Sequence, residues 1–310
     1  MQHGHYNEEM TGVLSLARRS RPWEQAIQSL MFFCAAVSIL TTLGIVVTLG
    51  TESWTFFNHV SPLEFFFTFE WQPTIEQFGI WPLFMATFMT SLAAMVIALP
   101  LGLGVAIYLS EYAPNTVRET LKPVLEVLAG IPTVVYGYFA LTVVTPFLRN
   151  IFGQDRVDVY NTLSAGLVMG VLILPLVSSM CEDALSSVPN SLREAAYAMG
   201  ATKLELSLNV MVPAAFSGIA ASFILGLSRA VGETMIVALA AGAGPNLTLN
   251  PFKAAETMTG HIVRISGGDI GYDTIDYQSL FAIALVLFIV TLGLNVLSRR
   301  IIRKYGEVYE

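Results

Sequence analysis

Residues 191–213 read SLREAAYAMGATKLELSLNVMVP and lie between two long apolar runs, residues 163–181 and 214–241. The run before this segment contains no charged residue, whereas the segment itself carries Arg, Lys and Glu side chains. A polar segment that joins two apolar runs of this length is typical of a connection between two membrane-crossing helices.

The segment contains two capping-box patterns, Ser191 with Glu194 and Thr202 with Glu205. In a capping box, Ser or Thr opens a helix and a Glu three residues later binds back to its amide group. We therefore predict two short helices that start at Ser191 and Thr202. An ordinary helical connector would carry the same caps.

Gly200 fits the end of the first short helix, because glycine adopts a left-handed backbone conformation at little cost. Pro213 fits the first turn of the next long helix, where a missing amide donor is not needed. Ala195 and Ala196 leave one side of the first helix nearly bare. The expected structure is a helical hairpin that another protein can approach closely.

The composition is that of an integral membrane protein: 54% of the residues are hydrophobic, 13% are charged, and the mean hydropathy is +0.63. A bilayer core of about 30 Å requires about 20 apolar residues per helical crossing. Six continuous apolar runs meet this requirement: 27–50, 83–109, 124–148, 163–181, 214–241 and 280–297. We predict an all-α integral membrane protein with about six transmembrane helices.

Lys and Arg gather on one side of the predicted membrane, as they do in cytoplasmic loops. These residues are Arg18, Arg19, Arg21, Arg118, Lys122, Arg193, Lys203, Arg299, Arg300, Arg303 and Lys304. Both termini are therefore expected in the cytoplasm. The expected divisions are a cytoplasmic polar tail (1–22) and a single transmembrane domain (23–310) with outward loops at 51–82 and 242–278 and a cytoplasmic loop at 185–213. The second outward loop should hold a short helix near residues 254–265.

The formal net charge of -7 comes mainly from Asp and Glu in the predicted outward loops, which argues against nucleic acid as a partner. Cys34 and Cys181 both lie inside apolar runs, which favours small core residues over a disulfide framework. The four histidines show no metal-binding spacing, so no metal site is predicted.

The fifth run, 214–241, contains Arg229 and Glu233, followed by Thr234. Residues four apart share one face of a helix. Each ionisable group costs about 3 kcal/mol inside a membrane helix, so such residues usually face protein or a water-filled path. Arg229 offers planar donors suited to an oxyanion, and Glu233 can hold Arg229 or accept a hydrogen bond from a protonated phosphate. The alternative is an ion pair that only fixes helix packing.

The third run, 124–148, is interrupted by Gly130 and Pro132, with Thr133 directly after them. In transporters, a broken helix often lines the solute path, because the freed backbone groups need polar partners. A simple packing kink would produce the same pattern.

The order Glu194, Ala195, Ala196, Gly200 and Pro213 resembles the EAA loop of bacterial ABC import permeases. This resemblance implies that the hairpin docks into an ATPase subunit and moves as a lever when two such subunits close on nucleotide. The chain contains no Gly-x-x-x-x-Gly-Lys-Ser/Thr motif of the kind that cradles phosphates. We therefore expect no enzymatic activity and no cofactor on this chain, with ATP and Mg used by the partner ATPase.

Three further motifs resemble the PstC-type permeases of the phosphate-specific ABC transporter: AIYLSEY at 106–112, AGIPTVVYG at 129–137 and RAVGETM at 229–235. The resemblance implies the type I ABC importer permease fold, a bacterial plasma (inner) membrane location and import of inorganic phosphate. The implied partners are a PstA-like second permease, two PstB-like ATPase subunits and a PstS-like phosphate-binding protein. The implied path residues are Arg229, Glu233, Thr234, Pro132 and Thr133, and the implied ATPase-coupling residues are Glu194, Ala195, Ala196, Gly200 and Pro213.

Three other functions fit parts of this pattern. A permease for another oxyanion, such as sulfate or molybdate, would keep the hairpin and differ within residues 229–235. A proton-coupled secondary transporter that uses Arg229 and Glu233 would need no ATPase. A membrane scaffold that reports phosphate status would tolerate the substitution Arg229→Gln.

Overall fold

The computed structural model describes residues 22–268, 271 and 274–305. The predicted polar tail lies outside the described residues apart from Pro22, and so do Arg18, Arg19 and Arg21. The chain divides into two units, Met1–Thr48 and Leu49–Glu310. The single transmembrane domain over residues 23–310 stays a prediction.

Helix α1 (Pro22–His59) begins in the first unit and ends in the second. Its part within the first unit is an apolar helix with exposed side chains, among them Leu30, Phe32 and Ile39. An exposed apolar surface of this length is typical of a helix surrounded by lipid or by another membrane helix.

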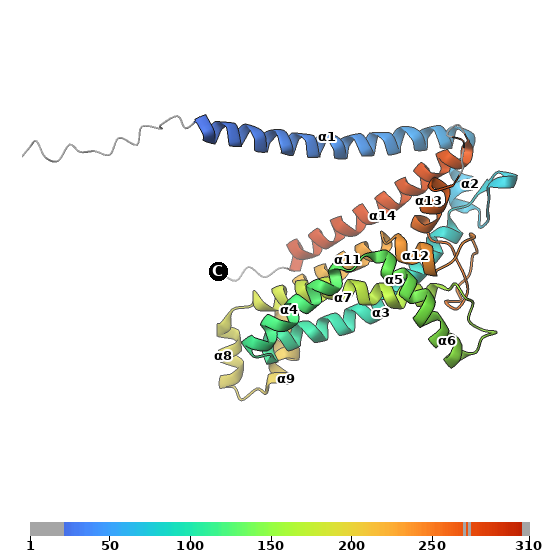
Figure 1. Cartoon of the computed structure of the whole chain (residues 1–310). Coiled ribbons are helices and arrows are strands. Elements are labelled where there is room, and N and C mark those ends of the chain that lie inside the picture. Colours follow the sequence, from blue (N-terminus) through green and yellow to red (C-terminus); the bar gives the residue numbers. More distant parts are fainter. Residues whose placement is uncertain (1–21, 269–270, 272–273, 306–310) are drawn as a thin grey trace, which may run out of the picture. The chain divides into compact units, whose positions relative to one another are not determined.

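The second unit is built almost entirely of helices, as the sequence predicted (Figure 1). The long helices are α3 (Trp81–Ile107), α7 (Thr162–Ser186), α11 (Phe216–Val231) and α14 (Ile275–Tyr305). The shorter helices are α2 (Pro62–Phe67), α4 (Asn115–Gly130), α5 (Thr133–Phe139), α6 (Thr145–Phe152), α8 (Asn190–Ala198), α9 (Lys203–Glu205), α10 (Val212–Ala214), α12 (Met235–Ala240) and α13 (Met258–Ser266). The remaining elements are a 3-10 turn η1 (Pro73–Ile75), three π-helical turns η2 (Tyr108–Tyr112), η3 (Ala140–Val144) and η4 (Leu206–Met211), and the strands β1 (Trp71–Gln72) and β2 (Gln77–Phe78).

The described residues contain five helices that are long and apolar enough to cross a membrane. These spans are Trp23–His59, Trp81–Tyr112, Thr133–Phe152, Thr162–Ser186 and Ile275–Lys304. A sixth is added if the bent pair Lys203–Ala214 and Phe216–Val231, which meet at 75°, counts as one span. The prediction of about six transmembrane helices is therefore confirmed.

The third crossing differs from the predicted run 124–148. Helix α4 ends at Gly130, and Ile131 is extended because the ring of Pro132 disfavours a helical residue before it. The crossing then starts at Thr133 and continues through η3 and α6 to Phe152. Its 20 residues give about 30 Å of helix, which matches the bilayer core.

The fifth crossing is not the uninterrupted helix that was predicted over residues 214–241. Helix α11 starts at Phe216 and ends at Val231, and a short break at residues 232–234 separates it from α12. The 16 residues of α11 span about 24 Å, which is less than the bilayer core requires. The break therefore lies inside the apolar region rather than at its edge.

The core of the second unit forms where α3 and α7 pack along each other. Glycines on α7 make this close contact possible. A Cβ atom at Gly166 would lie 2.5 Å from Cβ of Ala93, and one at Gly170 would lie 2.8 Å from the carbonyl oxygen of Ala94. Small residues at this spacing are typical of tight helix contacts in membranes.

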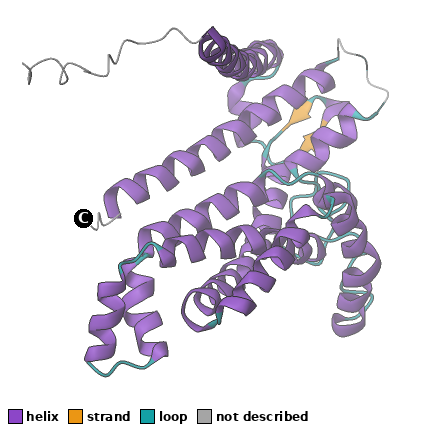
Figure 2. Cartoon of the chain, turned by 60° about the vertical axis from the view of Figure 1, so that its left-hand side comes forward, coloured by secondary structure: helices purple, strands orange, loops and turns teal. Residues whose placement is uncertain are grey.

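The first part of the predicted outward loop 51–82 is helical, because α1 continues to His59. The rest folds into α2 and a two-stranded antiparallel hairpin in which Trp71 pairs with Phe78 (Figure 2). Edge-to-face ring contacts join Phe56, Phe65, Phe78 and Trp71, which are all buried. These rings form a small core of their own.

The predicted loop 242–278 holds a short helix, as expected, but α13 starts at Met258 rather than near residue 254. The side chain of Thr257 caps it by accepting a hydrogen bond from the amide of Gly260, 3.1 Å away. Residues 275–278 belong to α14 and not to the loop.

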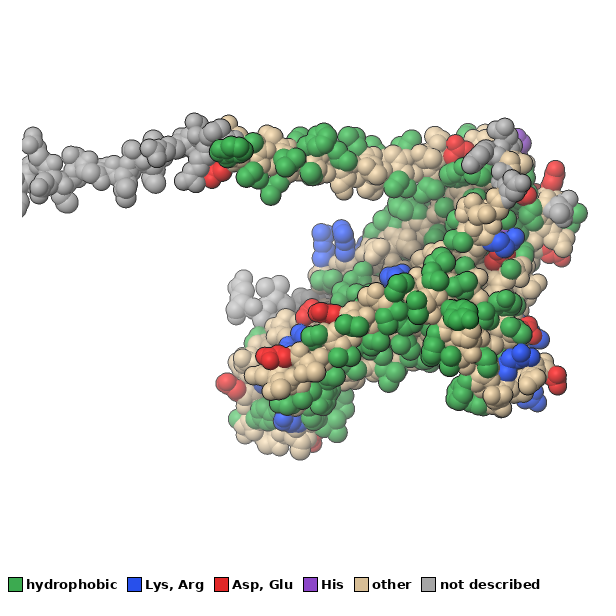
Figure 3. Space-filling model, viewed as in Figure 1, with side chains coloured by type: hydrophobic (Ala, Val, Ile, Leu, Met, Phe, Trp, Pro, Cys, Tyr) green, Lys and Arg blue, Asp and Glu red, His purple; other side chains and the backbone are tan. Residues whose placement is uncertain are grey.

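Charged side chains gather mainly towards two ends of the second unit, and hydrophobic side chains cover the faces between them (Figure 3). One end holds α8, α9 and the start of α4, and we refer to it as the hairpin end (Figure 1). The opposite end holds α2, the two strands and α13.

Candidate coupling hairpin and solute path

The hairpin is formed by α8 and by a second arm of α9, η4 and α10. The first helix does not begin with the predicted capping box of Ser191 and Glu194. Pro189 occupies the N-cap position in an extended conformation, so α8 begins at Asn190 and Ser191 falls inside its first turn. No side chain caps this end of α8, and the carbonyl oxygen of Pro189 accepts from the amide of Leu192 at 3.2 Å.

The turn between the arms follows the prediction. Gly200 has φ +86°, and its amide donates to the carbonyl of Tyr197 while that of Ala201 donates to Ala196. These two bonds form a Schellman motif, which satisfies the last carbonyl groups of α8. Glycine is favoured here because other residues are strained at positive φ.

The second capping box is confirmed. The hydroxyl of Thr202 accepts from the amide of Glu205 at 3.3 Å, and a carboxylate oxygen of Glu205 accepts from the amide of Thr202 at 2.8 Å. The hydrogen bonds from the backbone and side chain of Thr202 lower the pKa of Glu205. The second arm is therefore ordered from its first residue.

The tip of the hairpin presents apolar side chains to its surroundings. Met199 is 88% exposed, and Tyr197, Leu204 and Leu208 are exposed as well. Glu194 and Ala195 are also exposed, whereas Ala196 is half-buried against the core. Exposed apolar residues on a polar segment mark a surface for a protein partner. The sequence motif pointed to the Ala residues and missed these larger side chains.

Pro213 does not lie in the first turn of the membrane helix. It belongs to α10, which continues the second arm, and the chain then bends by 75° at Ala215 before α11 begins. A proline in the first turn of a helix is favourable because no amide donor is required there, and the three-residue α10 provides such a turn. Pro213 thus lies beside the bend between the hairpin and the bundle.

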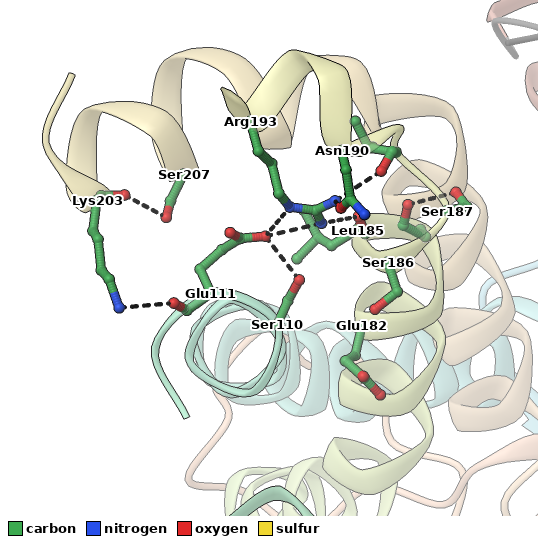
Figure 4. Close-up of polar contacts among 12 residues, drawn as sticks. Ser110, Glu111, Glu182, Leu185, Ser186, Ser187, Asn190, Arg193, Lys203 and Ser207 are labelled. Atoms are coloured by element: carbon green, nitrogen blue, oxygen red, sulfur yellow. Dashed lines mark hydrogen bonds and ion pairs between the residues drawn. The ribbon is translucent and has the colours of Figure 1, made fainter. Parts of the chain in front are cut away.

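At its base, the hairpin contacts the end of α3 (Figure 4). Arg193 on α8 donates from Nε and Nη2 to one carboxylate oxygen of Glu111, at 3.3 and 3.1 Å. Lys203 on α9 donates from Nζ to the backbone carbonyl of Glu111 at 3.4 Å. Sequence reasoning assigned no role to Glu111, because the residues that contact it lie 82 and 92 positions away.

Glu182 lies near the end of α7 but is not a solvated boundary charge. Its side chain is fully buried on α7 and forms ion pairs with Arg118 and Lys122 of α4, the latter at 2.5 Å. A buried carboxylate is retained when opposite charges compensate its lost hydration. Arg118 lies 64 positions from Glu182 and Lys122 lies 60 positions from it, so no local pattern could identify these contacts.

Arg229 and Glu233 do form the ion pair that their spacing suggested, with Nη1 2.9 Å from Oε2. They do not share one helix as predicted, because α11 ends between them and Gly232 occupies its C-cap. The side chain of Arg229 is 47% exposed, whereas that of Glu233 is 3% exposed. Thr234 follows as the N-cap of α12. The pair therefore lies at a break in the helix, with the carboxylate inside and the guanidinium reaching outwards.

Pro132 and Thr133 lie at the other predicted break, at the start of α5. Helix α5 packs against α12, where Gly137 lies against Met235 and Leu239. The two broken elements are therefore neighbours, although no hydrogen bond or ion pair joins Thr133 to the Arg229 pair within the described residues.

Helix α13 contacts the break at residues 232–234. The hydroxyl of Thr259 donates to the carbonyl of Glu233 at 2.6 Å, and the amide of Met258 donates to the hydroxyl of Thr87 on α3 at 3.0 Å. These bonds connect the loop after α12 both to the break and to the start of α3.

A buried carboxylate organises the loop around α13. Glu256 accepts from the amide of Gly244 at 3.1 Å and from Nε of Arg264 at 2.5 Å, and Nδ1 of His261 lies 3.3 Å from it. Burial raises the pKa of Glu256, but the hydrogen bonds and charges of His261 and Arg264 outweigh it and lower the pKa to about 2. No cluster of His, Cys, Asp and Glu suited to a metal occurs among the described residues.

An exposed hairpin at the end of an apolar helix bundle, together with a charged break inside that bundle, is typical of a membrane permease. The chain belongs to the family described as binding-protein-dependent transport system inner membrane component, whose model matches residues 98–306.

Individual relatives agree with this family. The chain is 36% identical over 262 residues to the Probable ABC transporter permease protein YqgH of Bacillus subtilis strain 168, covering 83% of this chain and 84% of the relative. It is 36% identical over 267 residues to the Phosphate transport system permease protein PstC of Xylella fastidiosa strain Temecula1, covering 79% and 81%. A chain of a bacterial alginate ABC transporter, crystallised with its periplasmic protein, has the same fold, with a TM-score of 0.62, 15% identity and coverage of 93% and 99%.

Proposed function

We propose that the chain is a permease subunit of an ATP-driven importer of inorganic phosphate. The observation that carries this proposal is the Arg229–Glu233 ion pair at the break between α11 and α12. Because Arg229 is half exposed, part of its guanidinium group is free to bind an oxyanion through paired N–H donors. The similarity to a phosphate transport permease supports the same cargo.

The position of Glu233 favours phosphate over sulfate. Phosphate at neutral pH carries a proton that it can donate to a carboxylate, whereas sulfate carries none. A buried carboxylate beside the guanidinium would therefore attract phosphate and repel sulfate. Since Glu233 already occupies one donor of Arg229, the site would bind weakly, which suits a path that must release its cargo.

The hairpin would couple this path to ATP hydrolysis. The exposed side chains of Tyr197, Met199, Leu204 and Leu208 form an apolar surface suited to a groove on a PstB-like ATPase subunit. Two such subunits would bind ATP and Mg, and this chain would bind neither. Their closure would move the hairpin and switch the path between outward and inward states. A PstA-like permease would complete the path, and a PstS-like protein would deliver phosphate.

The hairpin end would face the cytoplasm of a bacterial cell, with both termini on the same side of the inner membrane. Its positive residues support this orientation, because cytoplasmic loops are rich in Lys and Arg. In the described chain they include Arg118, Lys122, Arg193, Lys203 and Arg299.

The test is transport by the complete assembly in proteoliposomes, with phosphate, sulfate and molybdate compared at equal concentration. We expect ATP-dependent uptake of phosphate and stimulation of ATP hydrolysis by the phosphate-loaded binding protein. Copies of the assembly that carry Glu194→Lys should lose the ATPase during purification. Those that carry the same change at the exposed Glu119, on α4, should retain it.

The outcomes also separate the other functions. Stimulation by sulfate or molybdate alone would assign the permease to another oxyanion. Uptake without nucleotide would indicate a proton-coupled transporter that uses Arg229 and Glu233. A normal uptake rate in the Arg229→Gln variant would indicate a scaffold that reports phosphate status.

A further inference from the structure

We infer that Glu111 is the anchor through which the hairpin moves the rest of the permease, an inference that rests on the proposed function. Glu111 lies in η2, the π-helical turn that ends α3. Its side chain is only 5% exposed, although the turn lies at the hairpin end of the molecule. Isolated π-helical turns are rare and occur frequently at functional sites.

Both arms of the hairpin bind this one residue (Figure 4). The first arm contributes Arg193, which donates twice to the Glu111 carboxylate, and the second arm contributes Lys203, which donates to the Glu111 carbonyl. The Nζ atom of Lys203 also lies 5.6 Å from the ring centre of Tyr112, in the same turn. A rotation of the hairpin would therefore have to move the end of α3 or break these contacts.

Arg193 also joins the hairpin to the end of α7. Its guanidinium donates to the backbone carbonyls of Leu185 and Val188, at 3.0 and 2.8 Å. The hairpin also makes apolar contacts with the bundle, through residues such as Leu192 and Val210. Apolar contact is non-directional and permits sliding, whereas these directed hydrogen bonds fix the position of α8 relative to α3 and α7.

A continuous set of contacts leads from Glu111 to the charged break. Helix α3 has 27 residues, which give about 40 Å of helix from η2 to its start, with Pro100 inside it. Near that start, the hydroxyl of Thr87 accepts from the amide of Met258 on α13. The neighbouring Thr259 donates to the carbonyl of Glu233, the partner of Arg229. A displacement of α3 at Glu111 would thus reach the solute path through α13.

Glu111 is therefore a positioning residue that acts through α3 without touching solute or nucleotide. The test measures the number of phosphate ions transported per ATP hydrolysed, in proteoliposomes that contain the complete transporter. The variants are Glu111→Arg, Arg193→Glu, and the two changes combined, which reverse the ion pair. Glu119→Arg serves as the control, because Glu119 is an exposed carboxylate on the nearby α4.

We expect each single charge reversal to lower the transport ratio of the assembled transporter at least fivefold while the ATPase remains bound, and to lower the melting temperature because it places like charges together. The transport ratio of the combined variant should recover to within about twofold of the wild-type ratio. The control variant Glu119→Arg should have the wild-type ratio. If Glu111 served only folding, the single variants would lower the yield of assembled transporter but not the number of phosphate ions that the assembled transporter moves per ATP. If Glu111→Arg does not assemble, the isosteric Glu111→Gln should lower the ratio at least twofold.

A wild-type ratio in Glu111→Arg, or in Glu111→Gln where that variant is used, would overturn this inference and leave the proposed function intact. Failure of the combined variant to recover, with both single variants assembled, would overturn it as well. Absence of ATP-driven uptake by the wild-type assembly would contradict the proposed function, and the inference would fall with it.

Discussion

At the scale of single residues, three buried carboxylates at the two ends and at the break are each paired with a cation. Glu182 is paired with Arg118 and Lys122, Glu233 with Arg229, and Glu256 with Arg264. A buried charge without a partner would cost several kcal/mol, so each pair constrains the side chains around it. The cations of two of these pairs are about half exposed, Arg229 at 47% and Arg264 at 46%.

The first prediction concerns Arg229. Arg229→Gln should lower phosphate uptake at least tenfold, because the neutral amide cannot compensate the charge of an oxyanion. The variant also leaves Glu233 buried without a partner, which itself destabilises the protein. The double variant Arg229→Gln with Glu233→Gln separates these effects, since it should fold normally and still fail to transport. Arg156→Gln, in an exposed loop, is the control, and equal uptake by the double variant and this control would contradict the prediction.

The second prediction concerns pH. The folded state lowers the pKa of Glu256 from 4.5 to about 2, so the ionised carboxylate stabilises the fold. This contribution, at most about 3 kcal/mol, is complete above a pH of about 4.5 and is lost as the pH falls towards about 2. The groups that face Glu256 are the amide of Gly244, His261 and Arg264.

The measurement is the melting temperature of the purified protein in detergent between about pH 6 and about pH 3. Glu256→Gln should melt at a lower temperature at neutral pH and should lose less stability on acidification than the wild type. If the melting temperatures of the two proteins fall by the same amount on acidification, the ionised Glu256 does not contribute to stability in this pH range.

At the scale of elements, breaks and close contacts decide how the helices work together. Two predicted crossings are interrupted, one before Thr133 and the other at residues 232–234, and the broken elements α5 and α12 pack against each other. By contrast, α3 and α7 are long and packed tightly through Gly166 and Gly170. The molecule thus combines a tightly packed helix pair with broken helices at the proposed solute path.

The third prediction tests the close contact between α3 and α7. Gly170→Val should destabilise the protein by about 1–3 kcal/mol, because its Cβ would lie 2.8 Å from the carbonyl oxygen of Ala94. Gly104→Val is the matched control, since no atom lies within 4 Å of a Cβ there. The readouts are the melting temperature and the yield of folded protein. Equal behaviour of the two variants would mean that α3 and α7 separate without cost.

At the scale of the whole molecule, the separation of the two charged ends sets the requirements for its function. The hairpin lies at one end and the aromatic core with α13 at the other, so in the proposed function a signal between the ATPase and the binding protein must cross the bundle (Figure 1). Helix α3 is suited to carry it, because it contacts the hairpin base through η2 and α13 through Thr87.

The fourth prediction concerns the orientation of the hairpin relative to the membrane. The variants are made in a Cys34→Ser background, which removes the exposed cysteine and leaves the buried Cys181 in place. Met199→Cys, at the hairpin tip, should resist a membrane-impermeant thiol reagent in intact cells and react in inside-out membranes stripped of peripheral proteins. Leu249→Cys, exposed in the loop between α12 and α13, should show the opposite pattern. Labelling of Met199→Cys in intact cells would contradict the cytoplasmic position of the hairpin.

The sequence by itself determined the membrane class, the approximate number of crossings, the turn at Gly200 and the cap at Thr202, because apolar length and turn chemistry are local properties. It also placed Arg229 and Glu233 close together, since residues four apart are near each other whether or not the helix continues.

Only the tertiary structure decided where the crossings break and which distant charges meet. The break after Glu233 is held by Thr259, and Glu111 gains its role from Arg193 and Lys203, which lie more than 80 residues away. Such contacts arise when packing brings remote helices together. The free energy of a charged pair depends on how deeply its two side chains are buried, and not on the residues that adjoin them in sequence.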